Sequence, residues 1–91
     1  PFLRNTHNNI NNERHVRFVS DSQNLSASID IFDFSMDKII TLDAPIITNN
    51  QIEFIWNGSS EFGSKVNNGV YFCRLNDSGE SKWVKLAVLG D

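Results

Sequence analysis

The residues that could carry catalysis in this chain are two histidines, a scatter of serines and several aspartates. A serine hydrolase gathers Ser, His and Asp in space, but the sequence has no Gly-x-Ser-x-Gly nucleophile elbow. His7 and His15 lie in or near a polar amino-terminal stretch, which favours ordinary surface histidines. We therefore expect that the chain is not an enzyme.

Metal binding is the second chemistry that these residue types allow. His7 and His15, combined with Asp30 or Asp33, follow no spacing of a known ligand set. Asp30, Asp33 and Asp37 lie close along one expected strand and its turn, and oxygen-rich loops bind calcium weakly in extracellular modules. The Asp-x-Asp-x-Asp-Gly spacing is missing, so no metal or other cofactor is predicted. Calcium binding by these aspartates stays an alternative.

Thiol chemistry and glycosylation are weaker signals. Cys73 is the only cysteine, which excludes a disulfide within the chain and a zinc site built on cysteines. It lies inside an apolar run, so we predict a buried and unreactive thiol. Sequons begin at Asn24, Asn57 and Asn76, but this motif is frequent by chance, and we interpret these asparagines as turn residues.

Exposed aromatic side chains offer a last chemistry, stacking against sugars. Trp83 and Phe62 are the candidates, and Trp83 alternates with Val84 in the final apolar run. Burial, or a contact between domains, explains both residues at least as well. A glycan-binding module therefore remains an alternative to be tested.

The composition predicts one globular domain with a real core. The chain has 91 residues, 40% of them hydrophobic and 11% aromatic. A net charge of −3 with scattered Lys and Arg argues against nucleic acid as a partner, and no apolar run is long enough for a membrane span. Since the chain opens with Pro1 and not Met, we expect that it was excised or processed from a longer protein.

The elements that would position these residues are strands. Residues 1–13 are polar and rich in asparagine, which predicts a linker or an arm draped over the domain, and residues 14–91 form the domain itself. Within the domain, apolar residues alternate with polar ones, and Phe32 and Phe34 appear where polar residues are expected. We therefore expect this end of the strand to be covered on both faces. Strands are predicted over residues 15–19, 25–31, 38–42, 46–48, 51–56, 70–75 and 81–89.

Short strands separated by turn residues predict an all-β fold, a two-layer antiparallel sandwich of about seven strands. In the final run, Val84, Leu86 and Val88 oppose Trp83, Lys85 and Ala87. The predicted inward-facing set is Leu25, Ala27, Ile29, Ile31, Ile52, Phe54, Trp56 and either Tyr71, Cys73 and Leu75 or their alternates.

The middle of the chain holds a specific motif. An apolar run ends in Trp56-Asn57-Gly58, a polar stretch contains Gly63, and Asn68-Gly69 leads into Val70-Tyr71-Phe72-Cys73-Arg74-Leu75. This order resembles a bacterial family of immunoglobulin-like modules found at the carboxy-terminal ends of exported proteins. A relative of that family forms part of the flagellar hook-capping protein. The motif residues are Trp56, Gly58, Gly63, Gly69 and Tyr71.

The resemblance implies an Ig-like sandwich with a non-catalytic role in sorting or surface attachment, as in type IX secretion. It implies a protein partner, an extracellular or cell-surface location, and a final strand that serves as sorting or interaction strand. The residues of that strand are Trp83, Lys85, Leu86 and Val88. The alternative is a structural assembly module, such as a hook-cap-like scaffold or a surface-filament subunit.

Three local expectations follow from the same resemblance. The glycines at 58, 63 and 69 are candidates for positive φ angles or close backbone approach. Tyr71 lies two residues before Cys73, which resembles the tyrosine corner of antibody-type domains. Met36 stands where the family usually has a turn glycine, so we predict a turn of another type there.

Overall fold

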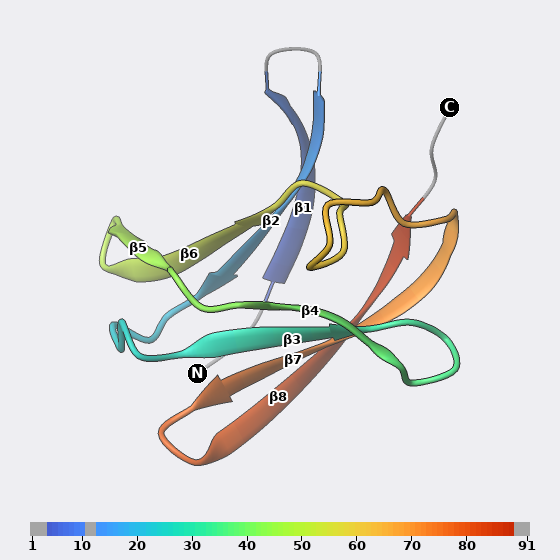
Figure 1. Ribbon diagram of the computed structural model, residues 1–91. Coiled ribbons are helices and arrows are strands. Elements are labelled where there is room, and N and C mark those ends of the chain that lie inside the picture. Colours follow the sequence, from blue (N-terminus) through green and yellow to red (C-terminus); the bar gives the residue numbers. More distant parts are fainter. Residues whose placement is uncertain (1–3, 11–12, 89–91) are drawn as a thin grey trace.

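The structure is a computed structural model that describes the backbone of residues 4–10 and 13–88 and the side chains of residues 15–88. The described residues form strands and no helix, so none of them belongs to a helix suited to crossing a membrane. The strands, drawn in Figure 1, are β1 (Arg4–Ile10), β2 (Glu13–Ser20), β3 (Ser28–Phe32), β4 (Lys38–Leu42), β5 (Ile46–Thr48), β6 (Gln51–Trp56), β7 (Gly69–Asp77) and β8 (Glu80–Val88).

The strands form two four-stranded antiparallel sheets that pack face to face (Figure 1). Sheet A has the order β1-β2-β6-β5, and sheet B has the order β4-β3-β7-β8. Sheet A reproduces the A-B-E-D order of immunoglobulin domains, and β3-β7-β8 reproduces their C-F-G order, with β4 added beside C. The prediction of a two-layer antiparallel Ig-like sandwich is confirmed.

Strand register explains which side chains meet in the core. In sheet A, Phe18 of β2 lies opposite Phe54 of β6, and in sheet B, Ile31 of β3 lies opposite Cys73 of β7. Because side chains alternate along a strand, each of these pairs places a whole row of apolar residues on the inner face. The buried core cluster is Val16, Phe18, Ala27, Ile29, Ile31, Ile52, Phe54, Trp56, Tyr71, Cys73, Leu75 and Leu86.

The prediction that Leu25 faces the core is wrong, because its side chain is 56% exposed. Residues 24–27 form a turn in which the Ala27 amide donates to the Asn24 carbonyl over 3.1 Å. The Asn24 side chain also accepts from the Ser26 amide at 2.9 Å. The alternation of β3 therefore begins only at Ser28, and Leu25 lies outside it.

The prediction of a linker or draped arm over residues 1–13 also differs from the structure. Residues Arg4–Ile10 form β1, which pairs antiparallel with β2 from Arg4↔Val19 to Ile10↔Glu13. Asparagine is a poor strand former, but the backbone groups along β2 need partners, and an edge pairing supplies them whatever the side chains are. With β1, the described residues contain eight strands, where the sequence predicts about seven.

The turn between β3 and β4 is a further correction. Met36 has a φ angle of 65°, so it adopts the left-handed conformation for which the sequence predicts a different turn type. The Asp33 carboxylate stabilises this conformation because it accepts from the amides of Ser35 and Asp37, each at 2.9 Å. The Asp33 carbonyl accepts from the Met36 amide at 2.9 Å. Side-chain hydrogen bonds thus offset the backbone strain that glycine would avoid.

Candidate interaction surface

The predicted motif residues Trp56 and Tyr71 hold the end of the core beside the long loop 57–68. The rings of Trp56 and Tyr71 contact edge to face, with centroids 6.0 Å apart. Trp56 Nε1 donates to the Ser59 carbonyl at 2.8 Å, and Tyr71 Oη donates to the Asn67 carbonyl at 2.6 Å. The second bond, from a tyrosine near the start of this strand back to the preceding backbone, defines a tyrosine corner.

The glycines of the motif shape this loop. Gly58 and Gly63 have φ angles of 80° and 87°, in the left-handed region that favours glycine. Gly69 begins β7 with a φ angle of 156°, so all three glycines have the expected positive φ. We conclude that Trp56, Gly58, Gly63 and Tyr71 build and fix the connection between β6 and β7.

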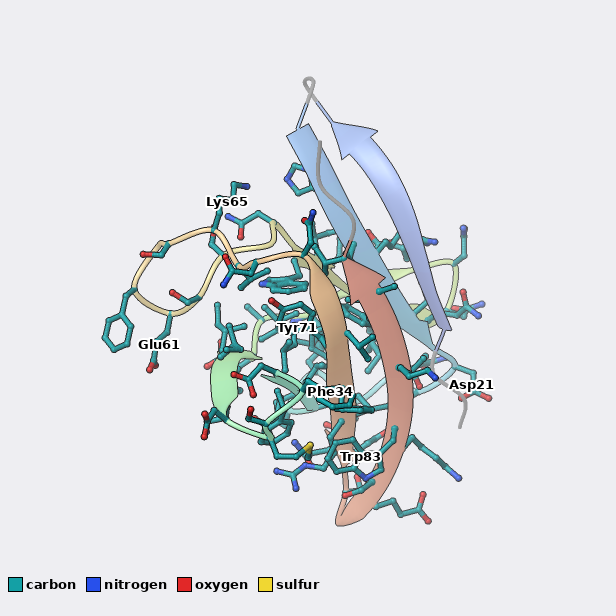
Figure 2. The ribbon with its side chains drawn as sticks, turned by 90° about the vertical axis from the view of Figure 1, so that its right-hand side faces the viewer. Asp21, Phe34, Glu61, Lys65, Tyr71 and Trp83 are labelled. Carbon is teal, nitrogen blue, oxygen red and sulfur yellow. The ribbon has the colours of Figure 1, made fainter. Side chains whose placement is uncertain are left out.

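The loop folds back over the edge of sheet B at β4. Its two arms meet in a bridge between Ser59 and Lys65, and the Glu61 amide donates to the Ile39 carbonyl of β4 at 3.1 Å. Val66 packs against the core from the same loop. Figure 2 shows Glu61 and Lys65 on this loop, to the left of β7 and β8. Phe62 lies next to Glu61 and is 86% exposed.

The predicted interaction strand, β8, divides into two sets of side chains. Leu86 is fully buried, and Val88 is half-buried and packs against the core. Trp83 and Lys85 are exposed on the outer side of sheet B. The structure therefore leaves Trp83 and Lys85 available to a partner, whereas Leu86 and Val88 belong to the fold.

Trp83 is part of an aromatic surface on the outer side of sheet B. We call this surface, made of Phe32, Phe34, Phe72, Trp83 and Arg74, the aromatic face. The rings of Phe32 and Trp83 lie 5.7 Å apart, and those of Phe34 and Phe72 lie 6.0 Å apart. Phe34 is 73% exposed and Trp83 is 50% exposed; both are labelled in Figure 2. The expectation that Phe34 is covered is therefore not met within the chain.

Arg74 connects the aromatic rings of this face. Its guanidinium carbon lies 5.3 Å from the centre of the Phe32 ring and 5.4 Å from that of the Trp83 ring. Its Nη2 forms an ion pair with Asp30 Oδ2 at 2.8 Å. Cation–π contacts with both rings restrict the arginine, and the arginine in turn restricts the Trp83 ring.

Asp30 anchors this arrangement in the sheet. Its carboxylate also accepts from Thr41 Oγ1 at 2.6 Å and from Asn76 Nδ2 at 2.9 Å. Burial alone raises the pKa of Asp30, but the hydrogen bonds from Thr41, Arg74 and Asn76 outweigh it and hold the pKa below its ordinary value. Four residues on four neighbouring strands (Thr41, Asp30, Arg74 and Trp83) thus form one row across sheet B.

The aromatic face is an apolar surface that the fold does not use. Its exposed rings present roughly 300–500 Å² of apolar area, the size of the largest patch on a typical monomer, and such patches are often functional. The core beneath it is already filled by residues of both inner faces. A rigid, half-exposed aromatic surface of this kind is suited to contact with another molecule.

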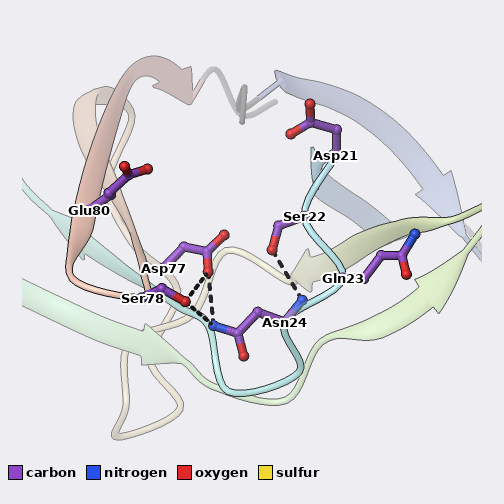
Figure 3. Close-up of a pocket in the computed structure, with 7 residues that line it drawn as sticks. All are labelled: Asp21, Ser22, Gln23, Asn24, Asp77, Ser78 and Glu80. Atoms are coloured by element: carbon purple, nitrogen blue, oxygen red, sulfur yellow. Dashed lines mark hydrogen bonds between the residues drawn. The ribbon is translucent and has the colours of Figure 1, made fainter.

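Figure 3 shows a second feature, an open polar hollow of about 580 Å³. Asp77 lies in this hollow, and its carboxylate accepts a hydrogen bond from Asn24 Nδ2 at 2.8 Å. Hydrogen bonds from Ser22 and Asn24 hold the pKa of Asp77 below its ordinary value, although burial opposes them. Those bonds bind two turns of the sandwich together. The hollow is lined by Asp21, Ser22, Gln23, Asn24, Asp77, Ser78 and Glu80.

The structure does not bring the candidate metal ligands together, as far as their side chains are described. Asp33 is engaged in the β3–β4 turn, and Asp30 is engaged with Arg74. Among the described residues there is no group of three His, Cys, Asp or Glu that could hold a metal ion. The side chain of His7 lies outside the described residues.

Cys73 is fully buried in the core, and burial raises the pKa of its thiol to about 12. The thiol is therefore protonated and unreactive at neutral pH. This agrees with its interpretation from the sequence as a small core residue.

Comparison of the chain with protein-family models, with curated proteins and with solved structures finds no match in any of the three. The surface is therefore interpreted from its own geometry.

Sequence reasoning missed most of this surface. It singled out Trp83 but not Phe72 or Arg74, because these residues become neighbours only through the pairing of β3, β7 and β8. The one available signal was the presence of Phe32 and Phe34 at positions where alternation calls for polar residues.

Proposed function

We propose that this chain is a non-catalytic Ig-like docking module of an exported bacterial protein, acting in sorting or in attachment to the cell surface. The observation that carries the proposal is the aromatic face: exposed rings on the outer side of a complete sandwich, among which Trp83 contacts Arg74, and Arg74 is paired with Asp30. Such a surface favours contact with a protein partner over chemistry. The resemblance of the Trp56-to-Leu75 segment to carboxy-terminal sorting modules supports the export context.

The proposal is tested by appending the chain to the carboxy end of a reporter in a bacterium with a type IX secretion route. We expect the reporter to reach the surface or the medium, and a Trp83→Ser, Lys85→Ser variant to be retained although it folds. The matched control is Lys65→Ser, which removes an exposed lysine from the loop instead. Normal export of the folded double variant would exclude the outer side of sheet B as the docking surface.

An assembly module is the second candidate, and the exposed rings of Phe34 and Trp83 favour it, because they offer an apolar contact to a neighbouring subunit. A scaffold or filament subunit would self-associate, which sedimentation of the isolated chain detects. The sorting role instead expects a monomer.

Glycan binding through Trp83 and Phe62 together finds less support. Phe62 belongs to the loop that covers the β4 edge, and Trp83 lies on β8, at the opposite edge of sheet B. Three strand spacings separate the two edges, about 14 Å, so the two rings do not form one stacking platform.

A further inference from the structure

The edges of the two sheets are not equally protected. The β4 edge is five residues long and is covered in part by loop 57–68. Its pairing with β3 is irregular, because the register shifts between Ile31 and Phe32 of β3. The β5 edge has three residues and follows Pro45. By contrast, β8 is nine residues long and regular, and among the described strands only β7 hydrogen-bonds with it. An edge of this length is a template for another strand.

The turn between β7 and β8 decides which backbone groups point to this edge. It is a two-residue turn in which Ser78 and Gly79 have φ angles of 53° and 83°, so Asp77 and Glu80 form the hydrogen-bonded closing pair. Hydrogen-bonded and non-hydrogen-bonded pairs alternate from there along the ladder. The N–H and C=O groups that point away from β7 are therefore those of Ser81, Trp83, Lys85 and Ala87; we call them the open edge.

The open edge and the aromatic face share residues. Trp83 and Lys85 present their side chains on the outer side of sheet B and their backbone groups to the open edge. Lys82 and Lys85 are both exposed and place positive charge in the middle of β8, with Glu80 at its start. A strand added here would thus meet unpaired backbone groups, a held tryptophan and two lysines at once.

We propose that the open edge of β8 binds an extended polypeptide strand that carries acidic side chains. The proposal rests on the docking function proposed above and names its mode, the addition of a strand to sheet B. A row of alternating donors and acceptors at strand spacing is matched by another extended backbone. Lys82 and Lys85 lie on opposite faces of β8, so a strand whose acidic side chains share one face meets one of them. That lysine selects acidic side chains, because opposite charges on adjacent strands attract.

A second copy of the chain fits this edge less well. When two β8 strands pair antiparallel about Lys85, the Lys85 side chains of both copies lie opposite each other and repel. The lysine that favours an acidic strand therefore disfavours this self-pairing.

The test uses the isotopically labelled chain and a capped peptide of alternating glutamate and valine, about seven residues long. We expect saturable shifts of the amide signals of Ser81, Trp83, Lys85 and Ala87 on addition of the peptide. The peptide with alternate backbone nitrogens methylated cannot pair and should bind at least about tenfold more weakly. The same peptide with lysine in place of glutamate should also bind more weakly.

A matched pair of variants tests the edge itself. Ala87→Pro removes an N–H that points to the open edge and leaves the bonds to β7, and it should weaken peptide binding at least about tenfold. Ala87→Thr keeps the N–H and should bind like the parent chain. Unchanged signals from β2, β3 and β6 would show that both variants fold.

Other outcomes overturn the proposal. One is that no amide signal shifts saturably at millimolar peptide, or that the shifted signals belong to another edge. A second is that the peptide binds Ala87→Pro as tightly as the parent chain, or that the methylated peptide binds as tightly as the unmethylated one. A third is that the signals of the open edge shift with chain concentration when no peptide is present. The last would identify a second copy as the occupant. If Ala87→Pro abolishes peptide binding but leaves export of the reporter normal, strand addition fails as the docking mode while the docking function stands. If the unaltered chain does not direct export, the proposed function fails on its own.

Discussion

The two edges of sheet B differ in how the fold treats their backbone. At β4, loop 57–68 donates the Glu61 amide to the Ile39 carbonyl, and Val66 of the same loop packs on the core. At β8, Leu86 is buried in the core, yet the backbone groups of the open edge have no hydrogen-bonded strand beside them among the described residues. The strand β8 is therefore held in the fold by its buried side chain, and its backbone is available on one side.

The largest effect on stability should come from Leu86, the buried residue of β8. We expect Leu86→Ala to cost about 2–4 kcal/mol of unfolding free energy, because Leu86 is 1% exposed and its removal leaves a cavity. Lys85→Ser, the neighbouring outward position, should change stability by less than about 0.5 kcal/mol. Chemical denaturation of the two variants measures both values. Equal losses would mean that β8 does not alternate between core and surface.

The next effect concerns the row that holds Trp83. Asp30→Asn should cost about 1–2 kcal/mol at neutral pH, because the charged partner of Arg74 is lost. The folded pKa of Asp30 lies below its ordinary value of 3.8, so its contribution is present above that value and is lost as the pH falls through the folded pKa. Denaturation curves of parent and variant should therefore converge at low pH. A gap that persists in acid would assign the cost to packing and not to the charge.

A smaller effect should come from the loop that covers β4. Gly63→Ala should cost about 1 kcal/mol, since an added Cβ meets no atom within 4 Å and only the φ angle of 87° is strained. Thermal unfolding of this variant, with Ser64→Ala as control, provides the measurement. We also expect faster exchange of the Glu61 amide, because the loop leaves the β4 edge more often. A stability equal to that of the control would contradict the left-handed geometry.

The smallest effect is a gain at the β3–β4 turn. Met36→Gly should stabilise the chain by about 0.5 kcal/mol, because glycine accepts the φ angle of 65° without strain and loses only part of that gain to unfolded-chain entropy. Met36→Leu should be neutral, which a parallel denaturation series can establish. A loss of stability in the glycine variant would show that the φ angle of 65° costs Met36 less free energy than the unfolded-chain entropy that glycine adds.

Local alternation explains how far the fold could be predicted from the sequence. Ile52, Phe54 and Trp56 share a face by period two alone, and their burial follows from it. Leu25 fits the same period, but a turn held by the Asn24 side chain places it outside β3. The strand β1 was missed because it forms by pairing with β2, which lies further along the chain. The asparagine content of β1 does not show that such a partner is present.

The candidate surface was even less predictable. Trp83 could be identified as outward-facing from its own strand, but its contact with Arg74 depends on the register of β7 against β8. The contact of Arg74 with Phe32 depends on a second register, that of β3 against β7. Surface sites assembled across strands require those pairings to be known before any single residue can be assigned to them.

Amide hydrogen exchange along β8 shows whether the strand is hydrogen-bonded to β7 on one side and open on the other. We expect alternating protection: the amides of Lys82, Val84 and Leu86 should be protected by their bonds to β7, whereas those of Trp83 and Lys85 should exchange quickly. Uniform protection along β8 in the isolated chain would contradict an open edge, because it would mean that the edge is already covered.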